Sequence, residues 1–353
     1  MKRKAIIITG GKLDSIYAKT AHGLIRGSDK FDIVAVIDEK HKGSDAGTVL
    51  DHVPRQIPIY SDVADFAQHG NGADVAILGV ATKGGIIPDS LRQEIKTAME
   101  AGLGIVNGLH EFVDDIPELK SIAEAKGLSI EDIRKPKPFR ALRFWNGDIQ
   151  QVKCPKIAIL GTDCAVGKRT TAKFLTEALN TAGFKAEMIY TGQTGWMQGA
   201  KYGFIFDATP NDFVSGELEG AMVKCYEEAQ PDIMFIEGQS SLRNPSGPCG
   251  SEMIISGNAD GVVLQHDPTR EQYKDMEFYP EFIPPPDDEI ALIKLLGAPT
   301  LALTVNTKRM KAEDVKPYQE DMEQKLGIPV VLPLEDGMDR LVSIFRNMIL
   351  NTK

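Results

Sequence analysis

The chain has 353 residues, 42% of them hydrophobic and 25% charged, which is long enough for two globular domains with sizeable cores. Its formal net charge of −10, without a basic run, argues against nucleic acid as a main partner but leaves room for a local anion site. The four cysteines lack C-x-x-C spacing and so suggest neither a zinc site nor disulfides. No apolar stretch is long enough to cross a membrane, and we expect a cytoplasmic protein without a membrane partner.

The first part of the chain alternates short β-type runs with helical patterns. Such alternation predicts a parallel sheet covered by helices on both faces, as in a doubly wound Rossmann-like domain. We expect strands at residues 5–9, 33–37, 57–60, 75–78 and 104–106, and helices at about 15–26, 61–68, 88–101 and 119–125.

The ends of these strands carry residues that are common in nucleotide-binding sheets. Gly10-Gly11 follows the first strand and Asp38 follows the second. The first loop is not G-x-G-x-x-G, which favours a structural or altered Rossmann unit over an NAD-binding one. The glycine-rich residues 79–85 suit a ligand cradle and a plain turn equally well. Whether this domain binds a ligand therefore stays open.

A change of composition marks the expected domain boundary. Lys135-Pro136-Lys137-Pro138 cannot continue a helix, and Asn146-Gly147-Asp148 is a turn signal. We expect a Rossmann-like domain at residues 1–148 and a P-loop NTPase-like α/β domain at residues 149–353.

The second domain opens on a strand, a glycine-bounded loop and a helical pattern. Gly161, Gly167 and Lys168 match G-x-x-x-x-G-K-[ST] at every fixed position except the last. In this pattern, backbone N–H groups at a helix N-terminus and a lysine surround a phosphate. The residues that we expect at the ligand phosphates are Gly161, Thr162, Asp163, Cys164, Ala165, Val166, Gly167, Lys168, Arg169 and Thr170.

The last position of the pattern departs from an NTPase. Arg169 stands where a Ser or Thr would hold magnesium, and the next hydroxyl, on Thr170, is rotated by about 100° around the helix. The loop is therefore expected to hold a diphosphate that is bound but not cleaved at phosphorus.

Later strands in this domain end in polar residues at the same sheet edge. Residues 232–239 have the form of a Walker B strand, which makes Glu237 a candidate metal ligand, water ligand or general base. His266 ends another strand, and a structural role and a site role are equally favoured for it. We further expect strands at residues 187–190, 261–265, 300–305 and 329–332, and helices at about 216–229 and 337–350.

The run from Gly161 to Lys168 resembles the phosphate loop of dethiobiotin synthetase, which also begins Gly-Thr-Asp and continues to Val-Gly-Lys. Ile236-Glu237-Gly238 looks similar too, as does Asn306 in the place of a base-recognising asparagine. The whole chain is similar to a family that joins a Rossmann-like half to such a phosphate-loop half and is catalogued as a domain of unknown function. Residues 161–171, 191–195 and 237–239 look like its signature.

Some members of that family are D-glutamate N-acetyltransferases, and the resemblance implies the same reaction here, with acetyl-CoA as co-substrate. In acetyl transfer an amine loses a proton and an oxyanion is stabilised. Glu237 and His266 could take the proton, and Gln193 could stabilise the oxyanion. The substrate-binding candidates are Thr191, Lys201 and Arg243, with Arg270 and Lys308 as further cations, and Asn306 would lie at the cofactor.

Other interpretations remain open at this point. An ATP-dependent carboxylase, ligase or kinase resembling dethiobiotin synthetase would place Mg²⁺ on Asp163 and Glu237, with Thr170 replacing the missing hydroxyl. A nucleotide-gated switch or metallochaperone finds no support, because the chain lacks a histidine run, C-x-C and Asn-Lys-x-Asp. Cys164 could be acetylated in a ping-pong reaction, although direct transfer is favoured. We also expect a homodimer or higher homo-oligomer.

Overall fold

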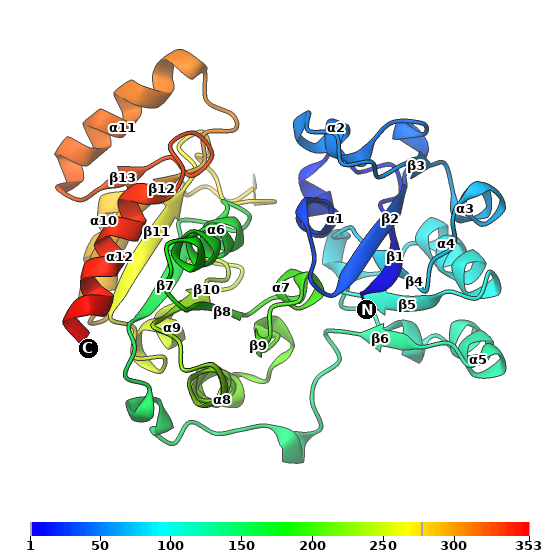
Figure 1. Ribbon diagram of the computed structural model, residues 1–353, viewed down its shortest axis with the longest axis horizontal. Helices are drawn as coiled ribbons and strands as arrows, with labels where there is room; N and C mark the ends of the chain where they lie inside the picture. Colours follow the sequence, from blue (N-terminus) through cyan, green and yellow to red (C-terminus); the bar gives the residue numbers. More distant parts are fainter. Residues whose placement is uncertain (1, 277, 353) are drawn as a thin grey trace. The chain divides into compact units, whose positions relative to one another are not determined.

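The computed structural model describes residues 2–276 and 278–352. The chain forms two compact units, one of residues 1–137 with 193–200 and one of residues 138–192 with 201–353 (Figure 1). Within the described residues, no helix combines the length and the apolar character that membrane crossing requires.

The first unit is a Rossmann-like domain, as the sequence predicts. Its six strands are all parallel in the order β3-β2-β1-β4-β5-β6, which is the strand order of dinucleotide-binding sheets. The strands are β1 (Arg3–Ile8), β2 (Phe31–Ile37), β3 (Ile59–Tyr60), β4 (Val75–Leu78), β5 (Gly104–Asn107) and β6 (Ile130–Asp132). The short strand β6 has no counterpart in the sequence prediction, since its Ile-Glu-Asp residues show no apolar run.

The helices of this unit lie where the apolar periodicity predicts them, with two additions. The α-helices are α1 (Lys19–Arg26), α2 (Ala46–Asp51), α3 (Val63–His69), α4 (Asp89–Glu100), α5 (Pro117–Lys126) and α7 (Gln193–Gln198). The 3-10 helices are η1 (Ile16–Ala18), η2 (Glu39–His41), η3 (Lys83–Gly85) and η4 (Val113–Asp115). Only α2 and α7 were not anticipated as α-helices.

Helix α7 belongs to the first unit although its sequence lies inside the second. Met197 is fully buried in the core of the Rossmann-like sheet. The Gln198 Nε2 donates to the carbonyl of Gly23 at 2.7 Å, and the Thr194 hydroxyl lies 3.0 Å from the hydroxyl of Thr20. The sequence does not predict a helix here, because six residues are too few to show a helical period.

The second unit is a P-loop α/β domain. Its seven parallel strands have the order β13-β12-β11-β7-β10-β8-β9. They are β7 (Lys156–Gly161), β8 (Ala186–Tyr190), β9 (Tyr202–Gly203), β10 (Ile233–Glu237), β11 (Gly261–His266), β12 (Thr300–Val305) and β13 (Val330–Val331). All residues of β7, β10 and β11 are buried, as expected for central strands covered on both faces.

Helices cover both faces of this sheet. Phe235 of β10 turns its ring toward Phe345, with centroids 5.3 Å apart, whereas its neighbours Met234 and Ile236 join a cluster that contains Leu218. The α-helices are α6 (Lys168–Thr181), α8 (Asn211–Ala229), α9 (Ser251–Ile255), α10 (Pro286–Leu295), α11 (Ala312–Leu326) and α12 (Asp339–Thr352). The 3-10 helices are η5 (Phe139–Ala141), η6 (Asp148–Gln151) and η7 (Phe206–Ala208).

The segment before β7 belongs to the second unit, earlier than the expected boundary after residue 148. Two buried glutamates of α8 accept its backbone N–H groups. Glu217 accepts from Arg143 at 3.1 Å, and Glu219 accepts from Asn146, Gly147 and Ile149 at 2.9 to 3.1 Å. These contacts place residues 138–148 with the second unit.

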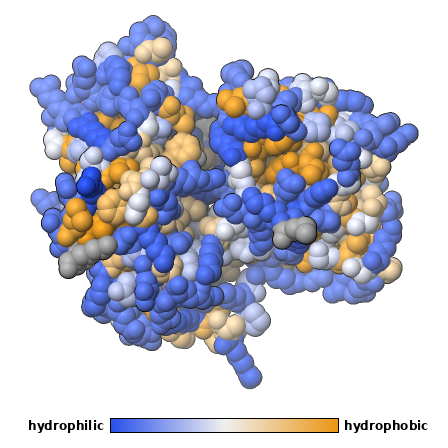
Figure 2. Space-filling view, in the orientation of Figure 1, coloured by the Kyte–Doolittle hydropathy of each residue, from blue (hydrophilic) through white to orange (hydrophobic). Residues whose placement is uncertain are grey.

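On the face drawn in Figure 2, hydrophilic side chains cover most of the surface of each unit, with smaller apolar patches among them.

Candidate functional site

The phosphate loop joins β7 to α6 at the carboxyl edge of the second sheet, and its backbone explains two of its glycines. Gly161 has no room for a side chain, because an added Cβ would lie 2.9 Å from Val166 and 3.1 Å from the carbonyl of Gln265. Gly167 has a φ of 124°, which L side chains rarely adopt. Ala165 also has a positive φ, at 54°. Non-glycine residues in that region concentrate at functional sites.

Lys168, the first residue of α6, bridges this loop and a neighbouring one through its ammonium group. Its side chain is buried, and its ammonium donates to the carbonyl of Asp163 at 2.7 Å and to that of Ser240 at 2.6 Å. Ser240 lies just after β10 and has a positive φ of 36°. The lysine therefore joins the phosphate loop to the loop after the Walker B-like strand, and its charge lies where an anion would bind.

Arg169 points toward the carboxylate at the end of β10. Its Nε lies 3.8 Å from Oε1 of Glu237, and both side chains are largely buried. The other oxygen of Glu237 accepts the Thr191 N–H at 3.1 Å, and the Thr191 hydroxyl donates to the Glu237 carbonyl at 2.6 Å. Arg169 of α6, Glu237 of β10 and Thr191 after β8 thus come together at the carboxyl edge of the sheet.

Asp163 holds a second loop onto the phosphate loop. It is fully buried, pairs with Arg270 at 2.8 Å and accepts the Lys274 N–H at 2.8 Å and the Asn244 amide at 2.9 Å. The two carboxylates that an ATP-dependent enzyme would use for magnesium, Asp163 and Glu237, are therefore both beside arginines. An arginine at each carboxylate opposes binding of a dication there.

The end of β11 supports the loop from its other side. His266 is buried, and its Nδ1 lies 3.0 Å from the Thr162 hydroxyl. Burial lowers the pKa of His266 to about 4, although the neighbouring Asp267 opposes this shift. The imidazole is therefore neutral at pH 7. The Asn306 amide donates to the Val166 carbonyl at 3.1 Å, so in this structure it supports the loop.

Other candidate residues have partners elsewhere. Arg243 pairs with the buried Glu289 at 2.7 Å, and Lys201 pairs with Glu228 at 2.9 Å. Gln193 lies in α7, within the first unit, where Arg134 donates to it at 3.0 Å. These partners are protein groups from distant parts of the sequence, which residue spacing does not reveal.

Cys164 and Thr170 are both partly exposed in the phosphate loop and the first turn of α6. The thiol of Cys164 lies 3.7 Å from the Ser240 hydroxyl and 4.0 Å from the Asn244 amide. A neighbouring imidazole or carboxylate, which would activate a nucleophilic thiol, is not among these partners.

Sequence reasoning missed three side chains that organise this site. Asn244 binds Asp163, Gln239 donates to the Thr191 hydroxyl at 3.0 Å, and Gln265 accepts from Thr171 and Thr304. Gln239 and Gln265 could have been found, because each lies at the carboxyl end of a predicted strand. Asn244 lies in an irregular loop, where no periodic signal exists.

Comparison with known proteins bears on both units. Residues 143–342 match the model described as "Domain of unknown function (DUF1611_C) P-loop domain", and residues 39–136 match "Domain of unknown function (DUF1611_N) Rossmann-like domain". A crystal structure of a DUF1611 family protein from Anabaena variabilis has a TM-score of 0.89 and 28% identity, covering 99% of this chain and 100% of that one.

Two relatives carry the name D-glutamate N-acetyltransferase. The protein from Tritonibacter scottomollicae is 29% identical over 279 residues, which are 77% of this chain and 80% of the relative. The one from a Pseudoalteromonas species is 30% identical over 277 residues, 77% of this chain and 81% of the relative. With both units matched in the order in which they occur, this chain belongs to the DUF1611 family.

Proposed function

We propose that this protein is an N-acetyltransferase that moves the acetyl group of acetyl-CoA to the amino group of D-glutamate. The observation that carries the proposal is the position of Arg169, which is turned toward Glu237 where a phosphate-cleaving enzyme would need magnesium. A cationic loop without a magnesium hydroxyl suits a diphosphate used as an anchor, and CoA carries one. The substrate comes from the name of the two relatives, both near 30% identical.

The reaction needs a base for the amine and a donor for the oxyanion. The amine nitrogen, after losing a proton, attacks the thioester carbon; the C–N bond forms, the C–S bond breaks, and the CoA thiolate takes up a proton. Glu237 is the base that we propose, because it lies at the end of β10 beside the phosphate loop. His266, neutral with a pKa of about 4, has its Nδ1 3.0 Å from the Thr162 hydroxyl, and we assign it a supporting role at the loop.

The oxyanion donor that we propose is a backbone group. The Thr191 N–H and hydroxyl are both used by Glu237. The next residue, Gly192, lies against Glu237 and Gln239, and an added Cβ would be 2.9 Å from the Gln239 amide. A side chain at position 192 would therefore crowd the Gln239 amide, and we propose the Gly192 N–H as the oxyanion donor.

The experiment compares two assays on the purified full chain. N-acetylation of D-glutamate by acetyl-CoA is measured in excess EDTA, beside ADP release from ATP with magnesium. We expect acetylation that is insensitive to EDTA and no ADP release above background. Activity in the second assay alone would assign the chain to the ATP-dependent carboxylases, ligases or kinases. The expected homo-oligomer and cytoplasmic location stay predictions, and light scattering of the purified chain tests the first.

A further inference from the structure

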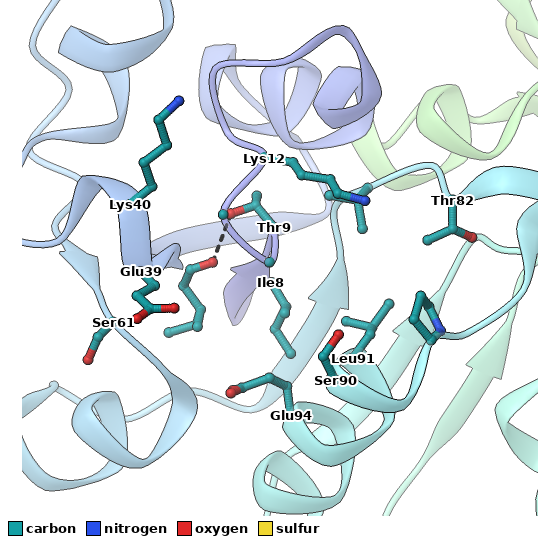
Figure 3. Close-up of a pocket in the computed structure, with 15 residues that line it drawn as sticks. Ile8, Thr9, Lys12, Glu39, Lys40, Ser61, Thr82, Ser90, Leu91 and Glu94 are labelled. Carbon is teal, nitrogen blue, oxygen red and sulfur yellow. Dashed lines mark hydrogen bonds between the residues drawn. The ribbon is translucent and has the colours of Figure 1, made fainter. Parts of the chain in front are cut away.

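The Rossmann-like unit contains a cavity that the proposed reaction at the phosphate loop does not use. It has a volume of about 570 Å³ and lies at the carboxyl ends of β1, β2 and β4 (Figure 3). The strand order reverses between β1 and β4, which is where doubly wound sheets bind ligands. Ile8, Ile37, Val80 and Leu91 give the cavity apolar walls. Its size is within the range of small-molecule sites.

One side of the cavity is suited to an anion. Gly10 and Gly11, with φ of 56° and 74°, form a turn over which an added Cβ would meet nothing within 4 Å. Within residues 2–276 and 278–352, neither glycine N–H has a hydrogen-bond acceptor, and the Lys12 ammonium has no carboxylate within 4 Å. Figure 3 shows Lys12 extended across the cavity, whereas Lys40 points away. Lys40 pairs with Asp14.

The opposite side is suited to a cation. Glu94, in the second turn of α4, uses Oε2 to accept the Val63 N–H at 2.9 Å. In the part of the chain that the structure describes, Oε1 of Glu94 and the hydroxyl of Ser90 have no hydrogen-bond partner. Burial raises the pKa of Glu94, and the Asp62 carboxylate adds to this effect, so a bound ammonium would stabilise the charged carboxylate.

The same structure disfavours a dinucleotide. Asp38, which would bind a ribose hydroxyl in an NAD site, is fully buried and accepts from Thr9 at 2.6 Å and from the Leu13 N–H at 2.9 Å. Helix α1 begins only at Lys19, after the 3-10 helix η1, so its N-terminus does not follow the glycine turn directly. Asp38 is therefore already hydrogen-bonded within the protein, and the helix N-terminus that would bind the pyrophosphate lies farther along the chain.

We propose that this cavity binds a small amino acid as a zwitterion, with the carboxylate at the Gly10–Lys12 turn and the ammonium at Glu94. Opposite charges across an apolar pocket match a molecule that carries both charges, and fit neither a polyanion nor a simple cation. The choice of D-glutamate as the probe rests on the proposed function, but the geometry of the cavity does not.

The test is isothermal titration of the full chain with D-glutamate in the absence of acetyl-CoA. We expect Lys12→Ala and Glu94→Gln each to weaken binding about tenfold, because each removes one charge-assisted contact. Glu94→Gln keeps an acceptor oxygen for the N–H of Val63, the first residue of α3, so this hydrogen bond between α3 and α4 is retained. Lys40→Ala is the matched control on the same rim, and we expect less than about a twofold change since Asp14 already holds that amine.

The outcomes separate this inference from the proposed function. No binding of D-glutamate, L-glutamate or glycine, or equal binding by wild type, Lys12→Ala and Glu94→Gln, overturns the amino-acid site. Binding of AMP or NAD that Lys12→Ala weakens, without amino-acid binding, would make the cavity a nucleotide site instead. If D-glutamate binds as expected but no N-acetyl product forms, the inference stands and the proposed reaction fails.

Discussion

Arg169 stands where an NTPase has the hydroxyl that binds magnesium. It brings a permanent positive charge to the ligand edge of the sheet, and its Nε lies 3.8 Å from Oε1 of Glu237. Two positive charges about 5 Å apart repel by several kcal/mol at an effective dielectric near 20, so arginine and magnesium exclude one another there. The position of this side chain beside Glu237 favours the proposed anchoring of a diphosphate over magnesium-assisted chemistry.

Replacing Arg169 by threonine tests this role directly. Arg169→Thr restores the phosphate-loop pattern and removes the charge, and we expect it to weaken acetyl-CoA binding about tenfold. Arg169→Lys keeps the charge without the planar guanidinium and should fall between the two. Isothermal titration measures both. Wild-type affinity in the Arg169→Thr variant would place the CoA phosphates away from this residue.

Lys168 is expected to bind the ligand phosphates. Lys168→Ala should weaken acetyl-CoA binding by about 1 to 3 kcal/mol, the range of a charge-assisted contact. Lys173→Ala is a control on the same helix, because Lys173 lies 3.5 Å from Glu177 at its surface. Titration with acetyl-CoA compares the two variants, and equal loss in both would show a general effect of charge.

His266 makes the stability of the second unit depend on pH. Burial lowers its pKa from 6.5 to about 4, so the folded form binds fewer protons than the unfolded form between these values. The stabilisation is fully present above pH 6.5 and is lost as pH falls toward 4; between pH 7 and 5 the loss is about 2 kcal/mol. Urea unfolding at both pH values measures it. His266→Gln, which does not titrate, should show a smaller difference, and an equal difference would assign the effect to other groups.

At the scale of elements, helix α8 determines where the second unit begins. Its buried Glu219 accepts three backbone N–H groups from residues 146–149, which would otherwise need other partners. The sequence showed a turn signal there but no reason for the turn to stay with the second unit. That reason is a glutamate about seventy residues later, and the distance between them in the sequence hides it.

Removing Glu219 should loosen this segment before anything else. Glu219→Ala leaves three backbone N–H groups without this acceptor, and we expect a cost of about 1 to 3 kcal/mol for the buried one, on Ile149. Glu219→Gln keeps one acceptor oxygen and should cost less. Hydrogen exchange of residues 146–149, with β11 as the internal reference, checks the prediction. Unchanged protection at these amides in Glu219→Ala would contradict it.

At the scale of the whole molecule, the first unit is built from two separate segments of the chain. The chain enters the first unit a second time at residues 193–200, between β8 and β9 of the second. Met197 from this passage is fully buried in the core of the Rossmann-like unit. A complete first unit therefore requires residues that are synthesised after residues 138–192 of the second unit.

A cavity created at Met197 should consequently destabilise the first unit. We expect Met197→Ala to lower its stability by about 2 to 4 kcal/mol, as for other large-to-small changes in a core. Hydrogen exchange in β1 and β2 should rise, while β10 and β11 of the second unit keep their protection. Gln198→Ala, which removes hydrogen bonds to Gly23 and Gly27 but no core volume, is the milder comparison. Exchange that rises only in β10 would refute the assignment of α7.

The sequence alone determined the two α/β units, the phosphate loop with its arginine, and Glu237 at the sheet edge, since these follow from local patterns: apolar runs, glycine positions and spacing. Only the tertiary structure decided which candidate cations already have partners. Arg243 and Lys201 looked available in the sequence but pair with Glu289 and Glu228. It also placed α7 in the first unit. The physical reason is that ion pairs and core packing depend on distances between residues far apart in the chain, which no local pattern contains.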